Sequence, residues 1–290
     1  MRYKNAVDLR RALEDRLKQE SVSTGSDLGR LQRRVVFDRV AVRLARDGGA
    51  QWVLKGGAAL EFRLRDRARA TKDLDIALAH GAADGPAIRE LLIDALAEDP
   101  DRDRFSFRVG GPNGLSQCAS GRGTWRFSVD AWLAGKTFGG VRLDVTARGE
   151  ELAATEQLAL PGVLWFAGIP ARSIEAVEPH QHFAEKFHAL TRDYGDRPNT
   201  RVKDLLDLVL LIEDGLLPDI ALVRAVRHVF TVRDTHPCPT AIPDPPPCWN
   251  TEYPRLAQPL AETSNDLAQA LKLLRGFWNI ALDRISRTEC

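Results

Sequence analysis

The spacing of apolar residues predicts helices toward both ends of the chain. Apolar side chains recur there every three or four residues, which places them on one face of a helix. The longer predicted helices cover residues 6–19, 28–46, 183–194, 202–213, 220–232 and 256–285. Arginines fill most of the other positions of the second helix: Arg30, Arg33, Arg34, Arg39, Arg43 and Arg46. We therefore expect these arginines on the polar face of an amphipathic helix.

Between these helices, shorter runs of β-branched and aromatic residues predict strands. The strands cover residues 51–55, 73–78, 105–109, 125–131 and 141–146, and shorter helices are expected after Gly57 and over 88–97. After Pro170 the strand-like runs give way to helices. The pattern therefore predicts an α+β protein, with a mixed-sheet domain and the N-terminal helices at 1–168 and a helical domain at 169–290.

Residues 236–254 (HPCPTAIPDPPPCWNTEYP) form a proline-rich insertion between two predicted helices. Proline lacks a backbone donor and fixes φ, so this segment is too stiff for regular structure. A recognition segment is one interpretation, but such insertions are more often surface loops. We expect a surface loop.

Composition narrows the class of protein. The 290 residues are 44% hydrophobic and 28% charged, which is typical of a soluble globular protein, and the net charge of +1 does not single out a nucleic-acid binder. No apolar stretch approaches the roughly 20 residues that cross a membrane, and the N-terminus lacks the apolar core of a signal peptide. The four cysteines form no CxxC pair, so neither a zinc site nor a disulfide framework is indicated. We expect a cytoplasmic protein without a membrane partner.

The strongest chemical signal is Gly56-Gly57 followed, after a helix, by Asp73-Leu74-Asp75. Side chains alternate along a strand, so Asp73 and Asp75 project to the same side. Two carboxylates held that close repel each other unless a proton or a cation lies between them. Hard cations such as Mg²⁺ prefer oxygen ligands and also bind substrate phosphates. The pair therefore predicts a metal site.

A third carboxylate is expected from a neighbouring strand. Asp144 lies in the apolar, β-prone run VRLDVTA, and Asp130 in RFSVDAW is a rival. We prefer Asp144, because its strand follows a hairpin-like turn around Gly139-Gly140, although it could also be a solvated residue of an edge strand. Three carboxylates on adjacent strands could hold two ions about 3.5–4 Å apart and clamp both oxygens of an in-line phosphoryl transfer.

The Gly-Gly turn has a matching role. Without a Cβ at Gly56 and Gly57, the backbone can approach a triphosphate, whose oxygens the N–H groups of the next helix can bind. A lone Gly-Gly or a lone DxD is a weak signal. The order strand, Gly-Gly, helix, DxD, strand, Asp is much more specific than any of its parts.

This order resembles the DNA polymerase β-like nucleotidyltransferase superfamily, and in particular the AbiEii-type toxins, which include the MenT toxins of mycobacteria. The matching segments are LKGGAALEFRLRDRARATKDLDIAL, RLDVTA and EPHQHFAEKFHALTRDYGDRPNTRVKDLLDLVLL, and the resemblance spans about residues 50–215. The superfamily's usual Gly-Ser is Gly-Gly here, which removes a hydroxyl, and AbiEii-like proteins often show this form.

The resemblance implies roles in the helical domain. Lys186 corresponds to a lysine that contacts the triphosphate, and Asp204 to an acid that activity requires, while Asp207 is the weaker candidate. Without the resemblance, all three would be interpreted as helix-surface residues. Arg192 and Arg201 lie near the same motif and are candidate phosphate ligands, with surface ion pairs as the alternative.

Thr71 corresponds to the family's Ser/Thr position beside the nucleotide site. A phosphate there would add about two negative charges next to the metal carboxylates. We therefore expect phosphorylation of Thr71 to switch such an enzyme off.

The implied activity is the transfer of nucleotides from a nucleoside triphosphate, with Mg²⁺ or Mn²⁺, to the 3′ end of tRNA, which blocks aminoacylation and translation. A cognate antitoxin is implied as a partner. Clustered basic residues favour a nucleic-acid acceptor, although a solvated charged surface is the competing interpretation. They are Arg63, Arg65, Arg67, Arg69 and Lys72 near the site, and Arg224, Arg227, His228 and Arg233 in the helical domain.

Two other classes of function stay open. The nucleotide acceptor could be a protein hydroxyl or a small molecule, as for other members of the superfamily. Alternatively, the chain could be a non-catalytic binding module with a decayed site. The retained Asp73, Asp75 and Asp144 argue against decay, because a binding module has no need of clustered acids.

Overall fold

The computed structural model describes residues 2–45, 51–80, 84–117, 123–147, 149–258 and 260–288. The chain forms two compact units. The sheet unit comprises Met1–Arg63, Ala70–Gly149 and Glu156–Ala176, and the helical unit comprises Leu64–Arg69, Glu150–Thr155 and Val177–Cys290. The expected domain boundary at residue 168 differs from this division, because the last strand of the sheet follows it.

The sheet unit contains one mixed sheet with eight strands in the described part of the chain. They are β1 (Trp52–Lys55), β2 (Asp73–Leu78), β3 (Phe105–Val109), β4 (Asn113–Gln117), β5 (Gly123–Leu133), β6 (Lys136–Thr146), β7 (Thr155–Ala159) and β8 (Ser173–Val177). Their order is β3-β5-β6-β2-β1-β8-β7, and β4 also pairs with β5. The central strand β2 is antiparallel to β1 and parallel to β6. The predicted α+β class and mixed sheet are confirmed, whereas β4, β7 and β8 were not predicted.

The turn between β5 and β6 lies at Ala134-Gly135, not at Gly139-Gly140 as expected. Ala134 and Gly135 both have positive φ, 56° and 70°, as a two-residue hairpin turn of the primed type requires. Gly139 and Gly140 instead lie within β6, where Gly140 faces Asp130 across the strand pair. The turn position sets which β5 residue faces each β6 residue.

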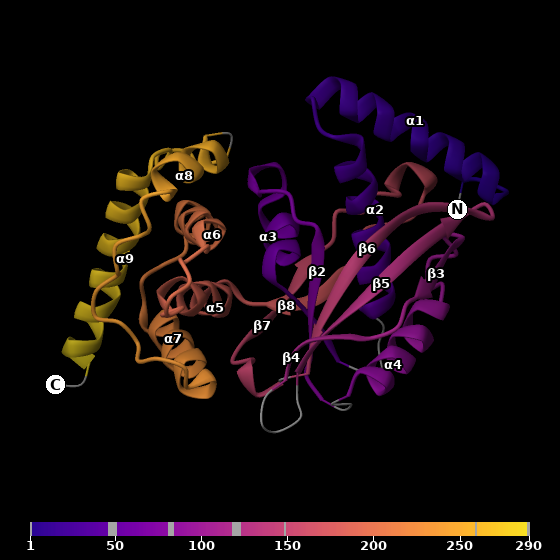
Figure 1. The fold of residues 1–290 in the computed structure, drawn as a ribbon. Helices are drawn as coiled ribbons and strands as arrows, with labels where there is room; N and C mark the ends of the chain where they lie inside the picture. Colours follow the sequence, from indigo (N-terminus) through magenta and orange to yellow (C-terminus); the bar gives the residue numbers. More distant parts are fainter. Residues whose placement is uncertain are drawn as a thin grey trace. The chain divides into compact units, whose positions relative to one another are not determined.

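Helices α1 (Ala6–Thr24), α2 (Leu28–Leu44), α3 (Gly56–Leu64) and α4 (Gly85–Ala97) accompany the sheet. The side chains of Asn5, Asp27 and Asp84 cap α1, α2 and α4 by accepting first-turn N–H groups. Helix α2 packs on β6 and α4 on β3 (Figure 1). Arg46 and the glycines expected to end the second helix lie outside the described residues.

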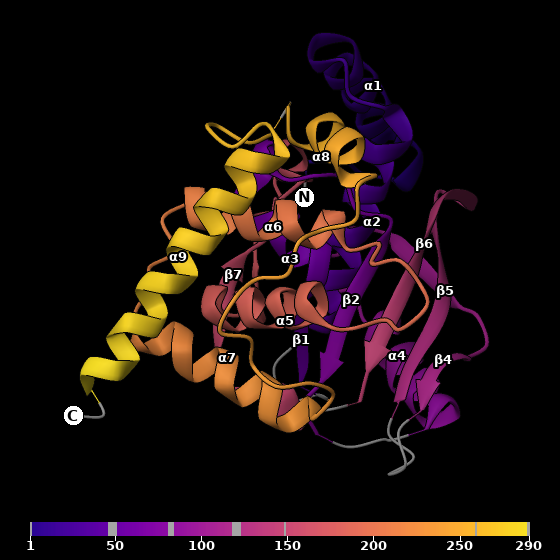
Figure 2. The same cartoon turned by 60° about the vertical axis from the view of Figure 1, so that its left-hand side comes forward.

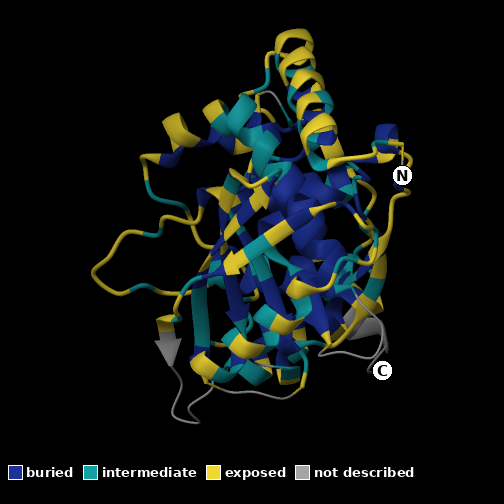
Figure 3. Ribbon diagram, turned by 90° about the vertical axis from the view of Figure 1, so that its right-hand side faces the viewer, coloured by how far each residue is buried: buried dark blue, intermediate teal, exposed yellow. Residues whose placement is uncertain are grey.

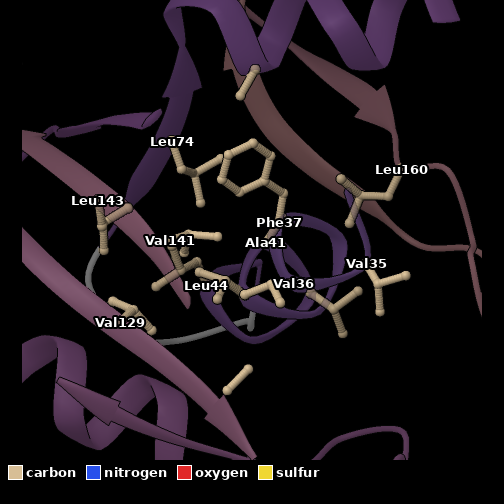
Figure 4. Packing of buried hydrophobic residues seen from close by; sticks show 14 of the residues in the cluster. Val35, Val36, Phe37, Ala41, Leu44, Leu74, Val129, Val141, Leu143 and Leu160 are labelled. Atoms are coloured by element: carbon tan, nitrogen blue, oxygen red, sulfur yellow. The ribbon is translucent and has the colours of Figure 1, made fainter. Parts of the chain in front are cut away.

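The core of the sheet unit lies between α2 and the sheet. Buried positions, dark blue in Figure 3, concentrate in the strands and in α2. Val36 and Phe37 of α2 pack with Leu74 of β2 and Leu143 of β6 (Figure 4). Each is at most 1% exposed, so each side chain contributes roughly 1.5–3 kcal/mol by burial.

Two arginines of α2 lie inside this unit, which corrects the expectation of a polar face. Arg39 and Arg43 are at most 1% exposed. Arg43 donates to both carboxylate oxygens of Asp103 at 2.8 and 2.7 Å, and Arg39 pairs with Asp38 and Asp101. Burial alone would raise the pKa of Asp103, but hydrogen bonding and charge from Arg43 lower it. Asp103 therefore stays ionised and compensates Arg43, whereas burial is the main cause that raises the pKa of Asp38, the partner of Arg39.

The helical unit contains α5 (Pro179–Thr191), α6 (Val202–Glu213), α7 (Ile220–Arg233), α8 (Trp249–Ala257) and α9 (Leu267–Thr288). Helix α5 packs on α6 and α7, and both of these contact α9 (Figure 2). The helix predicted over 256–285 is wrong at its start, because α8 ends at Ala257 and α9 begins only at Leu267. Within the described part of the chain, no helix is long and apolar enough to span a membrane.

The proline-rich insertion is a loop over residues 236–248, which form no helix or strand and are all at least partly exposed except Ile242, but it is helical after that. Its last residues form the start of α8, with Pro254 inside the helix, and Trp249 and Ile242 are buried. The Nε1 of Trp249 donates to the carbonyl of Asn199 at 3.1 Å. The expectation of no regular structure is therefore wrong for residues 249–254. Cys238 and Cys248 are free thiols, and Cys118 and Cys290 lie outside the described residues.

Candidate active site

The three predicted acids lie on one face of the sheet. Strands β2 and β6 are parallel, and their register places Asp75 opposite Asp144 and Asp73 opposite Arg142. Residues opposite each other on neighbouring strands share a face, and so do residues two apart on one strand. The structure therefore brings Asp73, Asp75 and Asp144 together. Asp130, the rival third acid, is exposed and lies opposite Gly140, four residues from the Asp144 position.

Two arginines that the sequence analysis did not single out pair with these acids. Arg126 lies opposite Asp144 on β5 and donates from Nε and Nη2 to its two carboxylate oxygens, both at 2.7 Å. The same Nη2 is 3.7 Å from Asp73 Oδ2, and Arg142 Nε is 2.5 Å from Asp73 Oδ1. The register of β5 and β6 would have identified Arg126 from the sequence, if the hairpin turn between these strands had been placed correctly.

The three acids suit a hard divalent cation, but their side chains are not arranged as a metal-binding site. Asp73, Asp75 and Asp144 offer only carboxylate oxygens, which Mg²⁺ and Mn²⁺ prefer. Among the residues that the structure describes, no group of three or more His, Cys, Asp or Glu side chains is arranged to hold a metal ion. Arg126 and Arg142 engage Asp144 and Asp73 instead. A cation could join these acids only after side chains move.

The first glycine of the Gly-Gly turn gives Asp75 its space. Gly56 begins α3 directly after β1 and has a φ of 61°. A Cβ at this position would lie 2.1 Å from Asp75 Oδ2 and 2.9 Å from Asp75 Cβ, so Asp75 would have to move. Glycine is therefore required both by the backbone conformation and by the approach of the acid. Gly57 follows within the first turn of α3 and is buried.

Thr71 is buried just before β2. Its backbone N–H donates to Glu61 Oε2 at 3.3 Å, and its hydroxyl donates to the carbonyl of Asp73 at 3.2 Å. Burial raises the pKa of Glu61 against the opposing effect of Arg30. Thr71 thus helps to hold the backbone that carries Asp73.

The helical unit contains a buried charge cluster of its own. Lys186 on α5 reaches Asp204 and Asp207 on α6, with Nζ 2.8 Å from a carboxylate oxygen of each. Arg69 donates from Nε and Nη2 to both oxygens of Asp207, also at 2.8 Å. Arg201 Nη1 lies 3.7 Å from Asp204. Lys186 and Asp207 are therefore not the surface residues that the helix pattern alone suggested.

Lys186 and Asp207 keep their charges in the folded protein. Burial alone would lower the pKa of Lys186, but Asp207 and Asp204 raise it above its ordinary value. Burial would raise the pKa of Asp207, but Lys186 and Arg69 lower it. Lys186 therefore stays positive and Asp207 negative near neutral pH.

The predicted phosphate ligands Arg192 and Arg201 lie around Tyr194. Their guanidinium carbons are 5.8 and 5.7 Å from the ring centre, and Arg201 Nε donates to the tyrosine hydroxyl at 3.0 Å. Arg192 also lines a cavity of about 390 Å³ in the helical unit, together with the proline-rich segment. Its lining combines apolar side chains such as Leu190 and Ile242 with charged and polar ones.

Several arginines of the predicted basic patch have acidic partners. Arg63 pairs with Glu156 at 2.6 Å within the sheet unit. In the helical unit Arg69 is held by Asp207, and Arg233 by Glu151 at 2.9 Å. Arg67 lies 3.3–3.8 Å from Glu213, Asp214 and Glu262. These pairs leave less uncompensated positive charge than the sequence suggested.

Comparisons with known proteins agree with this arrangement. The chain matches the family model "Nucleotidyl transferase AbiEii toxin, Type IV TA system" over residues 41–286. Its fold is similar to that of MenT4, a nucleotidyltransferase toxin from Mycobacterium tuberculosis H37Rv, with a TM-score of 0.55 and 18% identity over 93% of this chain and 89% of that chain. JHP933 from Helicobacter pylori matches with a TM-score of 0.45 and 14% identity over 90% of this chain and 95% of that chain. No curated protein sequence matches.

At 18% identity the MenT4 structure establishes the fold alone, and the family model carries the assignment. The model covers the Gly-Gly turn, the DxD pair, the third strand acid and the lysine of α5 within one continuous match. The chain therefore belongs to the AbiEii family of nucleotidyltransferase toxins from type IV toxin–antitoxin systems.

Proposed function

We propose that this toxin transfers nucleotides from a nucleoside triphosphate to the 3′ end of tRNA and thereby blocks translation in the cytoplasm. Membership of the family implies a nucleoside triphosphate substrate, a divalent cation and an antitoxin partner. The observation that carries the catalytic part is the register of β2 and β6, which opposes Asp75 to Asp144 with Asp73 on the same face.

We assign Asp73, Asp75 and Asp144 as the ligands of Mg²⁺ or Mn²⁺. When bound, such ions stabilise both the attacking and the leaving oxygen of an in-line phosphoryl transfer. The attacking group would be a ribose hydroxyl of the acceptor. Gly56 contributes by letting Asp75 approach the start of α3, and Thr71 by holding the backbone at Asp73.

The remaining assignments rest on the family resemblance, to which the structure adds the state of each side chain. Lys186 is proposed to contact the triphosphate, and its neighbours keep it charged. Asp204 is proposed as the acid that activity requires. Arg192 and Arg201 are proposed phosphate ligands, and Gly57 contributes a backbone N–H at the start of α3.

The choice of tRNA as acceptor rests on the resemblance more than on surface charge. Arg63, Arg67 and Arg69 are paired with acids, while Lys72 and Arg224 are exposed. The same pairing favours a second candidate, the nucleotidylylation of a protein hydroxyl. A protein acceptor, unlike tRNA, has no phosphate backbone that a basic surface of the enzyme would have to bind.

One experiment separates the two acceptors. The purified protein is incubated with total tRNA, or with a cell extract freed of RNA, and with each labelled nucleoside triphosphate plus Mg²⁺ or Mn²⁺. We expect label on tRNA with one preferred triphosphate, and none with a D73N/D75N variant. Label on a protein band alone would replace tRNA by a protein acceptor. A protein that labels neither and binds no triphosphate would be a binding module.

A further inference from the structure

Arg126 holds two of the three acids in a way that their role as metal ligands does not explain. Asp75, Asp144 and Arg126 lie opposite one another on β2, β6 and β5, and so form one row across the sheet. The Arg126 guanidinium uses two N–H groups on Asp144 and also lies 3.7 Å from Asp73. It therefore contacts two of the three proposed ligands at once.

The negative charge of Asp73, Asp75 and Asp144 explains why a guanidinium binds beside them. Three carboxylates on one face repel each other, and Arg126 and Arg142 supply two compensating positive charges. A guanidinium keeps its charge near neutral pH, so Arg126 acts as a permanent cation beside these acids.

A guanidinium and a divalent cation compete for the same oxygens. Both carboxylate oxygens of Asp144 accept from Arg126 at 2.7 Å. Mg²⁺ binds oxygens at about 2.0–2.1 Å in near-octahedral geometry. The two N–H groups of Arg126 occupy both oxygens of Asp144 and so obstruct this geometry. A nearby positive charge also opposes a second cation by simple repulsion.

We propose that Arg126 is a positioning residue that holds Asp144 in the metal-free enzyme and must leave it before a divalent cation binds. Arg126 takes the place of the cation among the acids and keeps the metal-free site intact. Its departure is a cost of metal loading, so the enzyme binds a free cation weakly. The inference rests on the proposed function only for the identity of the metal ligands.

Arg142 and Arg172 are the matched comparisons. Arg142 makes its ion pair with Asp73 alone, and its side chain is 49% exposed, against 30% for Arg126. Arg172 is an exposed arginine of the same unit whose carboxylate partner is Asp101 at 2.7 Å. Removing Arg126 should therefore change metal affinity more than removing Arg142, and removing Arg172 should not change it.

The test is a titration of the full chain with Mn²⁺ in the absence of nucleotide, with free Mn²⁺ measured by electron paramagnetic resonance. We expect R126Q to bind Mn²⁺ on the order of tenfold more tightly than the unchanged protein, with R126K in between, because lysine keeps the charge but not the fork. In the presence of a metal chelator, R126Q should have a lower melting temperature than the unchanged protein. Addition of Mn²⁺ should raise the melting temperature of R126Q more than that of R172Q.

A folded R126Q that binds Mn²⁺ no more tightly than the unchanged protein would overturn the proposal and leave the metal ligands standing. Absence of Mn²⁺ binding in every variant would overturn the proposal together with the metal assignment. If R126Q does not fold, the Nε–H resonance of Arg126 in the unchanged protein gives the answer. It should shift on addition of Mg²⁺ with a non-hydrolysable triphosphate, and a resonance that stays in place also overturns the proposal.

Discussion

Lys186 and Asp207 form an ion pair inside the helical unit, with Nζ 2.8 Å from Oδ2 and the Asp207 side chain fully buried. Asp207 also accepts hydrogen bonds from Nε and Nη2 of Arg69. Asp204 makes an ion pair with the same Lys186, and its side chain is 10% exposed. The weaker of the two sequence candidates is therefore the more deeply buried acid. Its role in the structure is to compensate two cations.

Replacement of Asp207 should destabilise the protein more than replacement of Asp204. D207A removes the fully buried carboxylate that Lys186 and Arg69 both contact, which we expect to cost about 3–5 kcal/mol of unfolding free energy. D204A should cost clearly less, because Asp207 still binds Lys186. Urea unfolding followed by circular dichroism measures both variants. Equal losses would contradict the assignment of Asp207 as the structural acid and Asp204 as the functional one.

The two candidates for the third strand acid can be separated by activity. We expect D144N to lower kcat on the order of a thousandfold, because a metal ligand supplies several kcal/mol of charge stabilisation to the transition state. D130N should keep kcat within about a factor of two, since Asp130 is exposed opposite Gly140. Initial rates of label transfer at saturating triphosphate give both values. Loss of activity in D130N with retention in D144N would reverse the assignment.

Much of the fold follows from local patterns that the sequence displays. The strands over 73–78 and 105–109 and the helix over 202–213 begin and end at the predicted residues. Strands β4 (NGLSQ) and β7 (TEQLA) escaped prediction because they are short and polar. Strand β7 ends the sheet and, within the described part of the chain, β4 pairs with β5 alone, so neither needs the apolar alternation of a half-buried strand.

Two other features depend on partners far away in the sequence. Arg43 is interpreted as a surface residue until its partner Asp103, 60 residues later, is known to lie beside it. For the site, alternation along β2 was sufficient to place Asp73 and Asp75 on one face. Arg126 required the β5–β6 register, which the misplaced turn at Gly139-Gly140 concealed.

Acid should weaken the protein through His188. Burial is the largest cause that lowers the pKa of this histidine to about 3, and the charge of Arg233 adds to it. The unfolded chain binds a proton near pH 6.5, so it holds more protons than the folded state between pH 6.5 and 3. Stability is therefore full above pH 6.5 and falls by up to about 1.4 kcal/mol per pH unit below it.

Unfolding free energies between pH 4.5 and 8 measure this slope. An H188Q variant, whose amide can still reach the Thr235 hydroxyl that now lies 2.8 Å from His188 Nε2, should have a shallower acid slope. Its stability at pH 8 should be lower by about 1 kcal/mol for the altered hydrogen bond. An unchanged acid slope would show that other groups govern acid unfolding.

Gly56 should be irreplaceable for activity for a reason beyond its backbone conformation. Gly56 and Gly195 have nearly the same φ, 61° and 62°, but a Cβ on Gly56 meets Asp75 Oδ2 at 2.1 Å, whereas a Cβ on Gly195 meets nothing within 4 Å. Both G56A and G195A should therefore lose about 1–2 kcal/mol of stability from left-handed strain. Only G56A should also displace Asp75 and lower kcat, by at least about a hundredfold if the acid binds the metal.

Melting temperatures and initial rates of the two variants separate strain from displacement. If G195A lost as much activity as G56A, strain alone would account for both, and the close approach of Gly56 to Asp75 would have no catalytic meaning.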